Sequence, residues 1–263
     1  MTEKNITAQI DSRGVAQVIL NRPEKHNAFD DTMIAELIKT FEALADNNDV
    51  RVVVLESRGK NFSAGADLEW MKRMAEYDYE ANLADARLLA AMLKALYQLP
   101  QPTIAKVQGA AFGGAVGLVS CCDMAVAEEG ASFCLSEAKI GLIPATIGPY
   151  VVRAIGERAS KRYFTTAERF TAATAHTLGL VSEVAVTGEL DEGADRIIEA
   201  LLNNGPQAVQ QAKQLVNDVA EKDLSEELIE DTCTRIARIR VSKEGQEGLT
   251  AFLNKRPASW AEE

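Results

Sequence analysis

The stretch QGAAFGGAVGLVSCCD, residues 108–123, indicates how this chain is folded. The preceding segment PTIAKV (102–107) is typical of a buried strand, and AVGLVSCC (115–122) is small and apolar enough for a buried helix. A strand that turns through Gly113 and Gly114 into a helix leaves unpaired backbone N–H groups at the start of that helix. The positive end of the helix dipole lies at the same point. We therefore expect a negative charge there, either a permanent phosphate or an oxyanion that exists only during a reaction.

The same order of strand, turn and helix recurs along the chain. ITAQID and VAQVILNRP predict a hairpin that turns at residues 12–14, and the apolar spacing after Asp30 predicts a helix capped by that residue. Strands are predicted at 50–57, 102–107, 123–127 and 131–135, with helices at 30–45, 68–74 and 80–99. Repeated strands of one polarity need helical crossovers, which predicts an α/β fold with parallel pairing.

The last quarter of the chain has no strand pattern. After about Gly188 we expect only helices, at about 191–202, 206–219, 225–239 and 243–253. We therefore divide the chain into a core over 1–190 and a helical C-terminal subdomain over 191–263.

Composition narrows the class of protein. The chain has 263 residues, 47% of them hydrophobic, and a formal net charge of −11. This charge argues against nucleic-acid binding and means that an acidic ligand needs a local basic patch. Four cysteines without a Cys-x-x-Cys pair predict free thiols in a reducing cytoplasm, and two histidines argue against a zinc site. The polar start does not resemble a secretory signal, and no apolar run has the length of a membrane span.

Two glycine turns share one layout. NFSAGADL (61–68) and FGGAVG (112–117) each follow a predicted strand and open a predicted helix, and both use small residues. One N–H group from each turn, converging on one oxygen, has the geometry of an oxyanion hole. The alternative is that the small residues only allow helices and strands to pack closely.

An oxyanion hole needs a partner for proton transfer, and Glu137 is our candidate. It follows the predicted strand SFCL, and Leu135, Ile140, Leu142 and Ile143 flank it. Burial among such residues raises the pKa of a carboxyl group toward working pH, which suits an acid–base catalyst. Taken alone, Glu137 fits a solvated or salt-bridged glutamate better than an acid–base catalyst.

At this point the sequence resembles a known family. LNRPEKHNAF, FSAGADL, PTIAKVQGAAFGGAVGLVSCCDMAVA, SEAKIGLIP and RYFTTAERFTAATAHTLGLVSEV are similar, in order and spacing, to blocks of the enoyl-CoA hydratase/isomerase, or crotonase, family. Several of these blocks resemble those of bacterial methylglutaconyl-CoA hydratases of leucine breakdown. The resemblance implies a crotonase-type spiral of β-β-α repeats with a helical C-terminal subdomain, assembled as a trimer or a dimer of trimers.

The resemblance also implies roles for particular residues. The N–H groups of Ala66 and Gly114 would hold the thioester oxygen, and Glu137 would be the acid–base. Residues implied to contact coenzyme A are Arg22, Lys25, Ala28, Ala64, Ala66, Asp67 and Leu68, with Phe252 and Lys255 contributed by a neighbouring subunit. Lys25 has the alternative of an ordinary surface lysine, and Phe252 that of a core anchor for the last helix. The resemblance implies neither a metal nor a redox cofactor, because backbone dipoles stabilise the enolate.

Two departures from the family pattern bear on the reaction. Typical hydratases of the family carry two glutamates, and this chain has Gly117 in place of the first. The family's PGxGG is replaced by PATIG (144–148). A single glutamate also suits an enoyl-CoA isomerase, which shuttles one proton.

Three functions follow as hypotheses. The first is hydration or dehydration of a branched enoyl-CoA, such as 3-methylglutaconyl-CoA to 3-hydroxy-3-methylglutaryl-CoA. The second is double-bond isomerisation or another reaction of the family. The third is a binding role, with RNA as its most specific form, which the net charge of −11 disfavours. A distal carboxylate on the substrate needs a cation or hydroxyl donor, for which Lys72, Arg73, Tyr79 and Tyr150 are candidates by type.

Overall fold

A computed structural model describes residues 4–261 of the chain. Its larger sheet has six strands in the order β1-β2-β3-β4-β6-β9. The first pair is antiparallel and forms the predicted hairpin, whereas every later pair is parallel. These strands are β1 (Ile6–Ile10), β2 (Val15–Leu20), β3 (Val52–Ser57), β4 (Thr103–Val107), β6 (Met124–Glu128) and β9 (Glu183–Ala185). Parallel pairing through helical crossovers confirms the predicted α/β class.

A second sheet holds three short strands in the order β5-β7-β8. They are β5 (Ala110–Phe112), β7 (Ser132–Cys134) and β8 (Phe170–Thr171). β5 follows β4 closely, and β7 follows β6, so each of these turns of the chain gives one strand to each sheet. Two isolated parallel bridges, Phe29 with Ala66 and Ser63 with Ala111, extend the same stacking toward earlier turns. The chain therefore winds as a spiral of β-β-α units.

Ten α-helices lie within residues 4–261. They are α1 (Asp31–Ala45), α2 (Leu68–Glu76), α3 (Tyr79–Tyr97), α4 (Gly114–Cys121), α5 (Gly148–Thr166), α6 (Ala172–Thr177), α7 (Leu190–Leu202), α8 (Pro206–Val219), α9 (Glu226–Val241) and α10 (Lys243–Leu253). Asp30 caps α1 as predicted, because its side chain accepts a hydrogen bond from the Met33 N–H. Asp67 caps α2 in the same way.

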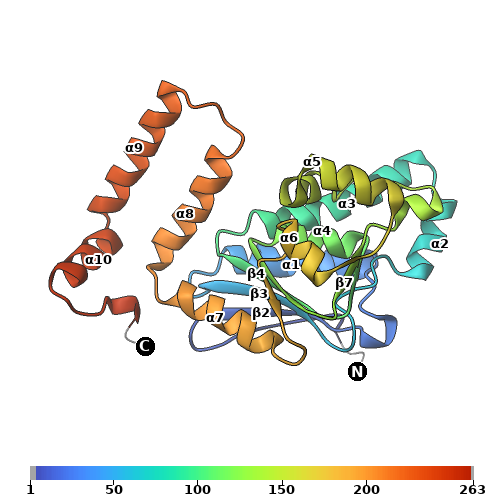
Figure 1. Ribbon diagram of the computed structural model, residues 1–263, viewed down its shortest axis with the longest axis horizontal. Coiled ribbons are helices and arrows are strands. Elements are labelled where there is room, and N and C mark those ends of the chain that lie inside the picture. Colours follow the sequence, from blue (N-terminus) through green and yellow to red (C-terminus); the bar gives the residue numbers. More distant parts are fainter. Residues whose placement is uncertain (1–3, 262–263) are drawn as a thin grey trace.

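Different helices cover the two faces of the larger sheet. Along β3, Val53 and Leu55 point into the main core with α1, α3 and α4, whereas Val52 and Val54 contact Ile198 of α7. This alternation follows from the two-residue period of a strand. Figure 1 shows α7 on one side of the strands and α1, α3 and α4 on the other.

The last three helices form an arm that extends away from the core (Figure 1). Ala251 is the one buried residue of α8, α9 and α10. In contrast, α7 packs on the sheet, and Arg51 donates hydrogen bonds to the carbonyl oxygens of Leu202 (2.7 Å) and Asn204 (3.0 Å) at its end. The projecting arm begins near Gly205, whereas α7, which follows the boundary predicted at residue 191, packs on the sheet. The outer ends of the two predicted domains, 1–3 and 262–263, lie outside the described residues.

Several elements between residues 110 and 185 were not predicted. β5, β8 and β9 are two or three residues long, which is too short for an alternating pattern to be recognised. In α5 the helical pattern is interrupted by Gly156, whose φ of 76° lies in the left-handed region and kinks the helix. In the part of the chain that the structure describes, no helix combines the length and the apolar character that crossing a membrane requires.

Candidate active site

The first glycine turn presents an unpaired N–H group at Ala66. Phe29 forms a parallel bridge here, in which its N–H donates to the Gly65 carbonyl oxygen (2.9 Å) and its own carbonyl accepts from the Asp67 N–H (3.0 Å). In a parallel bridge these bonds use the residues on either side of Ala66 and turn the Ala66 N–H away from Phe29. Within residues 4–261 the Ala66 N–H has no acceptor.

The second glycine turn lies against the first. A Cβ atom on Gly65 would stand 2.7 Å from the carbonyl oxygen of Phe112, so only glycine allows this approach. Gly113 has a φ of 54° and donates its N–H to the Cys134 carbonyl oxygen at 2.8 Å. Gly114 begins α4, and its N–H has no acceptor within the described residues. The structure thus brings the Ala66 and Gly114 turns together, as the oxyanion-hole hypothesis requires.

Glu137 lies over the second turn. Its Oε1 atom is 3.3 Å from the position that a Cβ would take on Gly113. Its Oε2 atom is buried and has no hydrogen-bond partner in the described part of the chain. Desolvation by burial raises the pKa of this carboxyl group, which is the direction that an acid–base catalyst near neutral pH requires.

The source of this desolvation differs from the sequence prediction. Ile140, Leu142 and Ile143 are exposed, with 58%, 53% and 77% of their surface accessible, whereas Leu135 is buried. Residues 137–140 form a short 3-10 helix in which no residue is fully buried. The carboxylate itself lies against the Gly113 turn.

A cavity of about 450 Å³ opens beside the first turn. Six of its lining residues were predicted as coenzyme A contacts, namely Lys25, Ala28, Ala64, Ala66, Asp67 and Leu68. His26 and Glu69 also line it and were not predicted. Both lie next to predicted residues in the sequence, but His26 adopts a left-handed φ of 52° that no sequence pattern signals.

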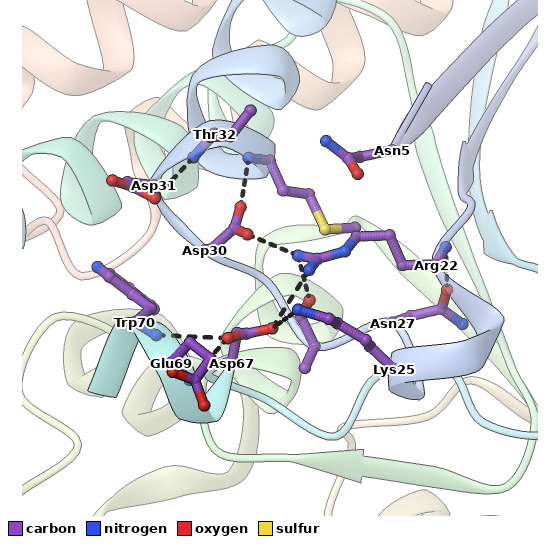
Figure 2. A network of polar contacts seen from close by, with 12 residues as sticks. Asn5, Arg22, Lys25, Asn27, Asp30, Asp31, Thr32, Asp67, Glu69 and Trp70 are labelled. Atoms are coloured by element: carbon purple, nitrogen blue, oxygen red, sulfur yellow. Dashed lines mark hydrogen bonds and ion pairs between the residues drawn. The ribbon is translucent and has the colours of Figure 1, made fainter. Parts of the chain in front are cut away.

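A buried network of charges supports this cavity (Figure 2). Arg22 forms ion pairs with Asp30 at 2.8 Å and with Asp67 at 3.2 Å, and Lys25 Nζ lies 3.1 Å from the same Asp67 oxygen. Desolvation pushes the pKa of Asp67 upward, but hydrogen bonds from Lys25 and from two backbone N–H groups at the start of α2 lower it overall. Asp67 is therefore an ionised anchor for the turn that carries Ala66.

Arg22 is buried and paired within the chain. Its side chain is 8% exposed, and its guanidinium is held by Asp30, Asp67 and the Ala28 carbonyl oxygen. Arg22 thus supports Asp67, and its predicted contact with coenzyme A stays a prediction. Lys25, in contrast, is 47% exposed at the mouth of the cavity.

Phe252 and Lys255 lie far from this cavity in their own chain. Both belong to the end of the arm, at the opposite side of the molecule from α2 (Figure 1). Phe252 is 81% exposed, which rules out the alternative that it anchors the last helix in the core. Their predicted contact with the coenzyme A of a neighbouring subunit stays a prediction.

The four candidates for recognising a distal carboxylate differ in their exposure and in their partners. Lys72 is paired with Glu69 at 2.7 Å and Arg73 with Asp31 at 2.8 Å, all on the surface. Tyr79 is 75% exposed. Tyr150 is half-buried against Tyr97, with ring centroids 5.2 Å apart.

The site brings together backbone donors and one carboxylate. No group of three or more His, Cys, Asp or Glu side chains suited to a metal occurs in the described residues. Two free N–H groups at adjacent turns can stabilise one developing oxyanion, and the carboxylate above them can move a proton.

Comparison with known proteins identifies the family of the chain. The family model described as Enoyl-CoA hydratase/isomerase matches residues 11–263. The chain belongs to the enoyl-CoA hydratase/isomerase family. It is 33% identical to 2,3-dehydroadipyl-CoA hydratase of Escherichia coli, over 92% of this chain and 93% of that protein.

Solved structures agree with the family. An enoyl-CoA hydratase from Shewanella pealeana superimposes with a TM-score of 0.94 at 49% identity, covering 98% of this chain and 96% of that one. An enoyl-CoA hydratase from Mycobacterium smegmatis superimposes with a TM-score of 0.93 at 34% identity, covering 98% of this chain and 99% of that one. The crotonase-type fold is thereby confirmed, and the chain is an enzyme of the enoyl-CoA hydratase type, a class of hydro-lyases.

Proposed function

We propose that the chain adds water to, or removes it from, a branched α,β-unsaturated acyl-CoA, with 3-methylglutaconyl-CoA or a close analogue as substrate. The observation that carries this proposal is the juxtaposition of two unpaired N–H groups, at Ala66 and Gly114, with the buried carboxylate of Glu137. It supplies an oxyanion hole and an acid–base in one place.

The proposed reaction uses these groups in sequence. The thioester oxygen accepts hydrogen bonds from Ala66 and Gly114, which favour negative charge on that oxygen together with the positive end of α4. Glu137 takes a proton from water as the water oxygen bonds to the β-carbon and the double bond shifts to form the enolate. The protonated Glu137 then returns that proton to the α-carbon, so that one carboxyl group serves a syn addition.

Coenzyme A is proposed to lie along the cavity that Lys25, Ala28, Ala64 and Leu68 line. Its apolar walls suit the adenine and pantetheine parts, and the exposed ammonium of Lys25 suits a phosphate. Because the chain carries a net charge of −11, such a local cation is needed for a polyanionic ligand.

The choice of a methylglutaconyl group rests on resemblance and on one relative. The Escherichia coli relative is named 2,3-dehydroadipyl-CoA hydratase, and a dehydroadipyl group, like a methylglutaconyl group, is dicarboxylic. Arg73, the closest in type to a carboxylate receptor, would have to exchange its surface pair with Asp31 for the substrate.

Isomerisation is a second candidate because the site holds one carboxylate. Gly117 replaces the position at which typical hydratases of the family carry another glutamate, and a single base is enough to shuttle a proton between two carbons. The hydratase names of the relatives favour hydration.

An ultraviolet assay separates the two reactions. Hydration of 3-methylglutaconyl-CoA or crotonyl-CoA removes the absorbance of the conjugated enoyl thioester and adds the mass of one water to the product. Isomerisation of a 3-enoyl-CoA creates that absorbance and leaves the mass unchanged. Appearance of absorbance with no hydrated product would replace the proposal with the second candidate.

The arm is proposed to join copies of the chain into a trimer or a dimer of trimers. Val241, Leu249, Phe252 and Leu253 are exposed on it, with 49–81% of their surface accessible. Apolar side chains in such numbers on one projecting element suit burial against a second copy. We also propose that the enzyme works in the cytoplasm, which the free cysteines support.

A further inference from the structure

Gly117 lies in the second turn of α4 and faces another helix at very short range. A Cβ atom on Gly117 would stand 2.7 Å from Ile147 Cβ and closer still to Ile147 Cγ2, with Leu93 Cδ2 at 3.5 Å. Ile147 is 2% exposed and precedes α5 directly. The Ile147 side chain therefore fills the space that any side chain at position 117 would need.

This space lies about one helical turn beyond the contact of Glu137 with the start of α4. Gly113 precedes α4 with a non-helical φ of 54°, and Glu137 Oε1 lies 3.3 Å from the position of its Cβ. Gly117 follows three residues after Gly114, and residues three apart are neighbours on the surface of a helix. At Gly117 the nearest side chain is that of Ile147. The isoleucine thus meets α4 within about one turn of both the Glu137 contact and the Gly114 N–H.

The first residues of α4 offer no polar side chain. Residues 114–119 of α4 are all glycine or apolar, and Ala115, Val116 and Leu118 are buried. Glu137 Oε2 has no partner among the described residues, so no protein group from α4 reaches it. Beyond the carboxylate, these residues of α4 and the neighbouring Ile147 therefore offer only apolar surface.

We infer that Gly117 and Ile147 form a matched pair in which Ile147 closes the acyl end of the site and restricts it to short acyl chains. This inference rests on the proposed function, since it places the acyl group beside Glu137. The glycine is required because a side chain at 117 would displace Ile147, and the isoleucine is required because a smaller residue would leave an open apolar space. The two departures from the family pattern, Gly117 and PATIG, are then one structural feature.

Binding of saturated thioesters tests the selectivity without any turnover. Calorimetry would compare butanoyl-CoA and octanoyl-CoA, with free CoA as reference, on the wild type, Ile147→Ala and Gly148→Ala. Removing three carbons from the wall should shift the preference toward octanoyl-CoA at least tenfold in Ile147→Ala, because one methylene in an apolar pocket changes discrimination by about 10–200-fold. The Gly148→Ala variant should keep the wild-type preference, because its added methyl would make only an ordinary van der Waals contact, with Phe164 Cε2 at 3.8 Å.

Thermal melting tests the pair itself. Gly117→Ala should lower Tm by about 5 °C or more because overpacking forces Ile147 to move. The double variant Gly117→Ala/Ile147→Ala should melt at or above Gly117→Ala, since the new methyl then occupies vacated space. Additive losses in Tm would overturn the pairing.

The outcomes of the binding test separate the two proposals. An unchanged preference for chain length in Ile147→Ala, alongside tight binding of both thioesters, would overturn the role of Ile147 alone. Failure of the wild type to bind either thioester, with free CoA equally weak, would contradict the acyl-CoA site and with it the proposed function.

Discussion

Arg22 Nη2 lies 3.2 Å from Asp67 Oδ2, and both side chains are less than one tenth exposed. This ion pair joins the loop before α1 to the residue that caps α2. Because Asp67 follows Ala66 directly, the pair fixes the backbone that presents the Ala66 N–H. A surface charge interaction could not hold an amide with this precision, whereas a buried, hydrogen-bonded pair has few alternative geometries.

Removing the guanidinium should destabilise the fold strongly. We expect Arg22→Ala to lower the free energy of unfolding by about 3–5 kcal/mol, because Asp67 would be left as a buried charge with only Lys25 beside it. Denaturant titration measures this loss. Arg13→Ala is the matched control, since its pair with Asp11 is surface-exposed and should contribute less than about 1 kcal/mol. Equal effects of the two substitutions would contradict the support role of Arg22.

Lys25 should act on binding and leave the chemistry unchanged. Lys25→Ala is expected to raise KM roughly tenfold or more with little change in kcat, because a charge-assisted contact to a phosphate contributes about 1.5–3 kcal/mol in both ground and transition states. Lys72→Ala serves as control, being paired with Glu69 on the surface outside the cavity lining. A fall in kcat at unchanged KM would contradict this role.

The hydrogen bond from the Ala66 N–H should stabilise only the transition state. Ala66→Pro deletes that donor without removing either hydrogen bond of the Phe29 bridge, and kcat should fall about 10²–10³-fold. Ala66→Gly keeps the N–H and should keep most of the activity. Circular dichroism of both variants checks that α2 still forms. A folded proline variant with wild-type kcat would remove Ala66 from the site.

Glu137→Gln should abolish turnover while leaving coenzyme A binding intact. The expected loss in kcat is at least about 10²–10⁴-fold, the usual contribution of a general acid–base. In the wild type, burial raises the pKa of Glu137, so the acidic limb of the rate profile should lie at a higher pH than for an ordinary glutamate. Near-normal turnover of the glutamine variant would move the role to another residue.

The same substitution should make the protein more stable at neutral pH. Because the folded pKa of Glu137 is raised above the unfolded one, the folded state holds the proton more tightly, and stability falls as pH rises from the unfolded pKa through the folded one. The glutamine side chain of the variant carries no charge, so its Tm advantage over the wild type should grow from acid to neutral pH. A constant Tm difference across pH would contradict the desolvated carboxylate.

The arm should be needed for assembly. Leu253→Glu places a charge where 76% of a leucine side chain is exposed in the single chain, and it should shift light-scattering mass toward the monomer if a second copy covers this position. Val186→Glu, exposed on the core, is the control. A wild-type monomer would contradict the proposed assembly.

Local patterns in the sequence were enough to predict much of this protein. The Asp30 cap and the spacing Met33, Leu37 and Phe41 predicted α1, because a helix repeats its buried face every three to four residues. The two glycine turns and Glu137 were predicted from residue type and order, since only glycine and small residues allow backbones to approach as Gly65 approaches Phe112. The helical pattern of α7 does not indicate that this helix covers the sheet while the helices after it project from the core.

Only the tertiary structure decided which charged groups pair and which side chains compete for the same space. The burial of Arg22 between Asp30 and Asp67 has no signal in the residues next to it, because the two carboxylates come from other segments. Ile147 and Gly117 are thirty residues apart, and nothing in either stretch indicates that one fills the space of the other. The physical reason is that helix and strand periods, caps and turns arise from neighbours along the chain, whereas burial, ion pairing and excluded volume arise between segments that meet only after folding.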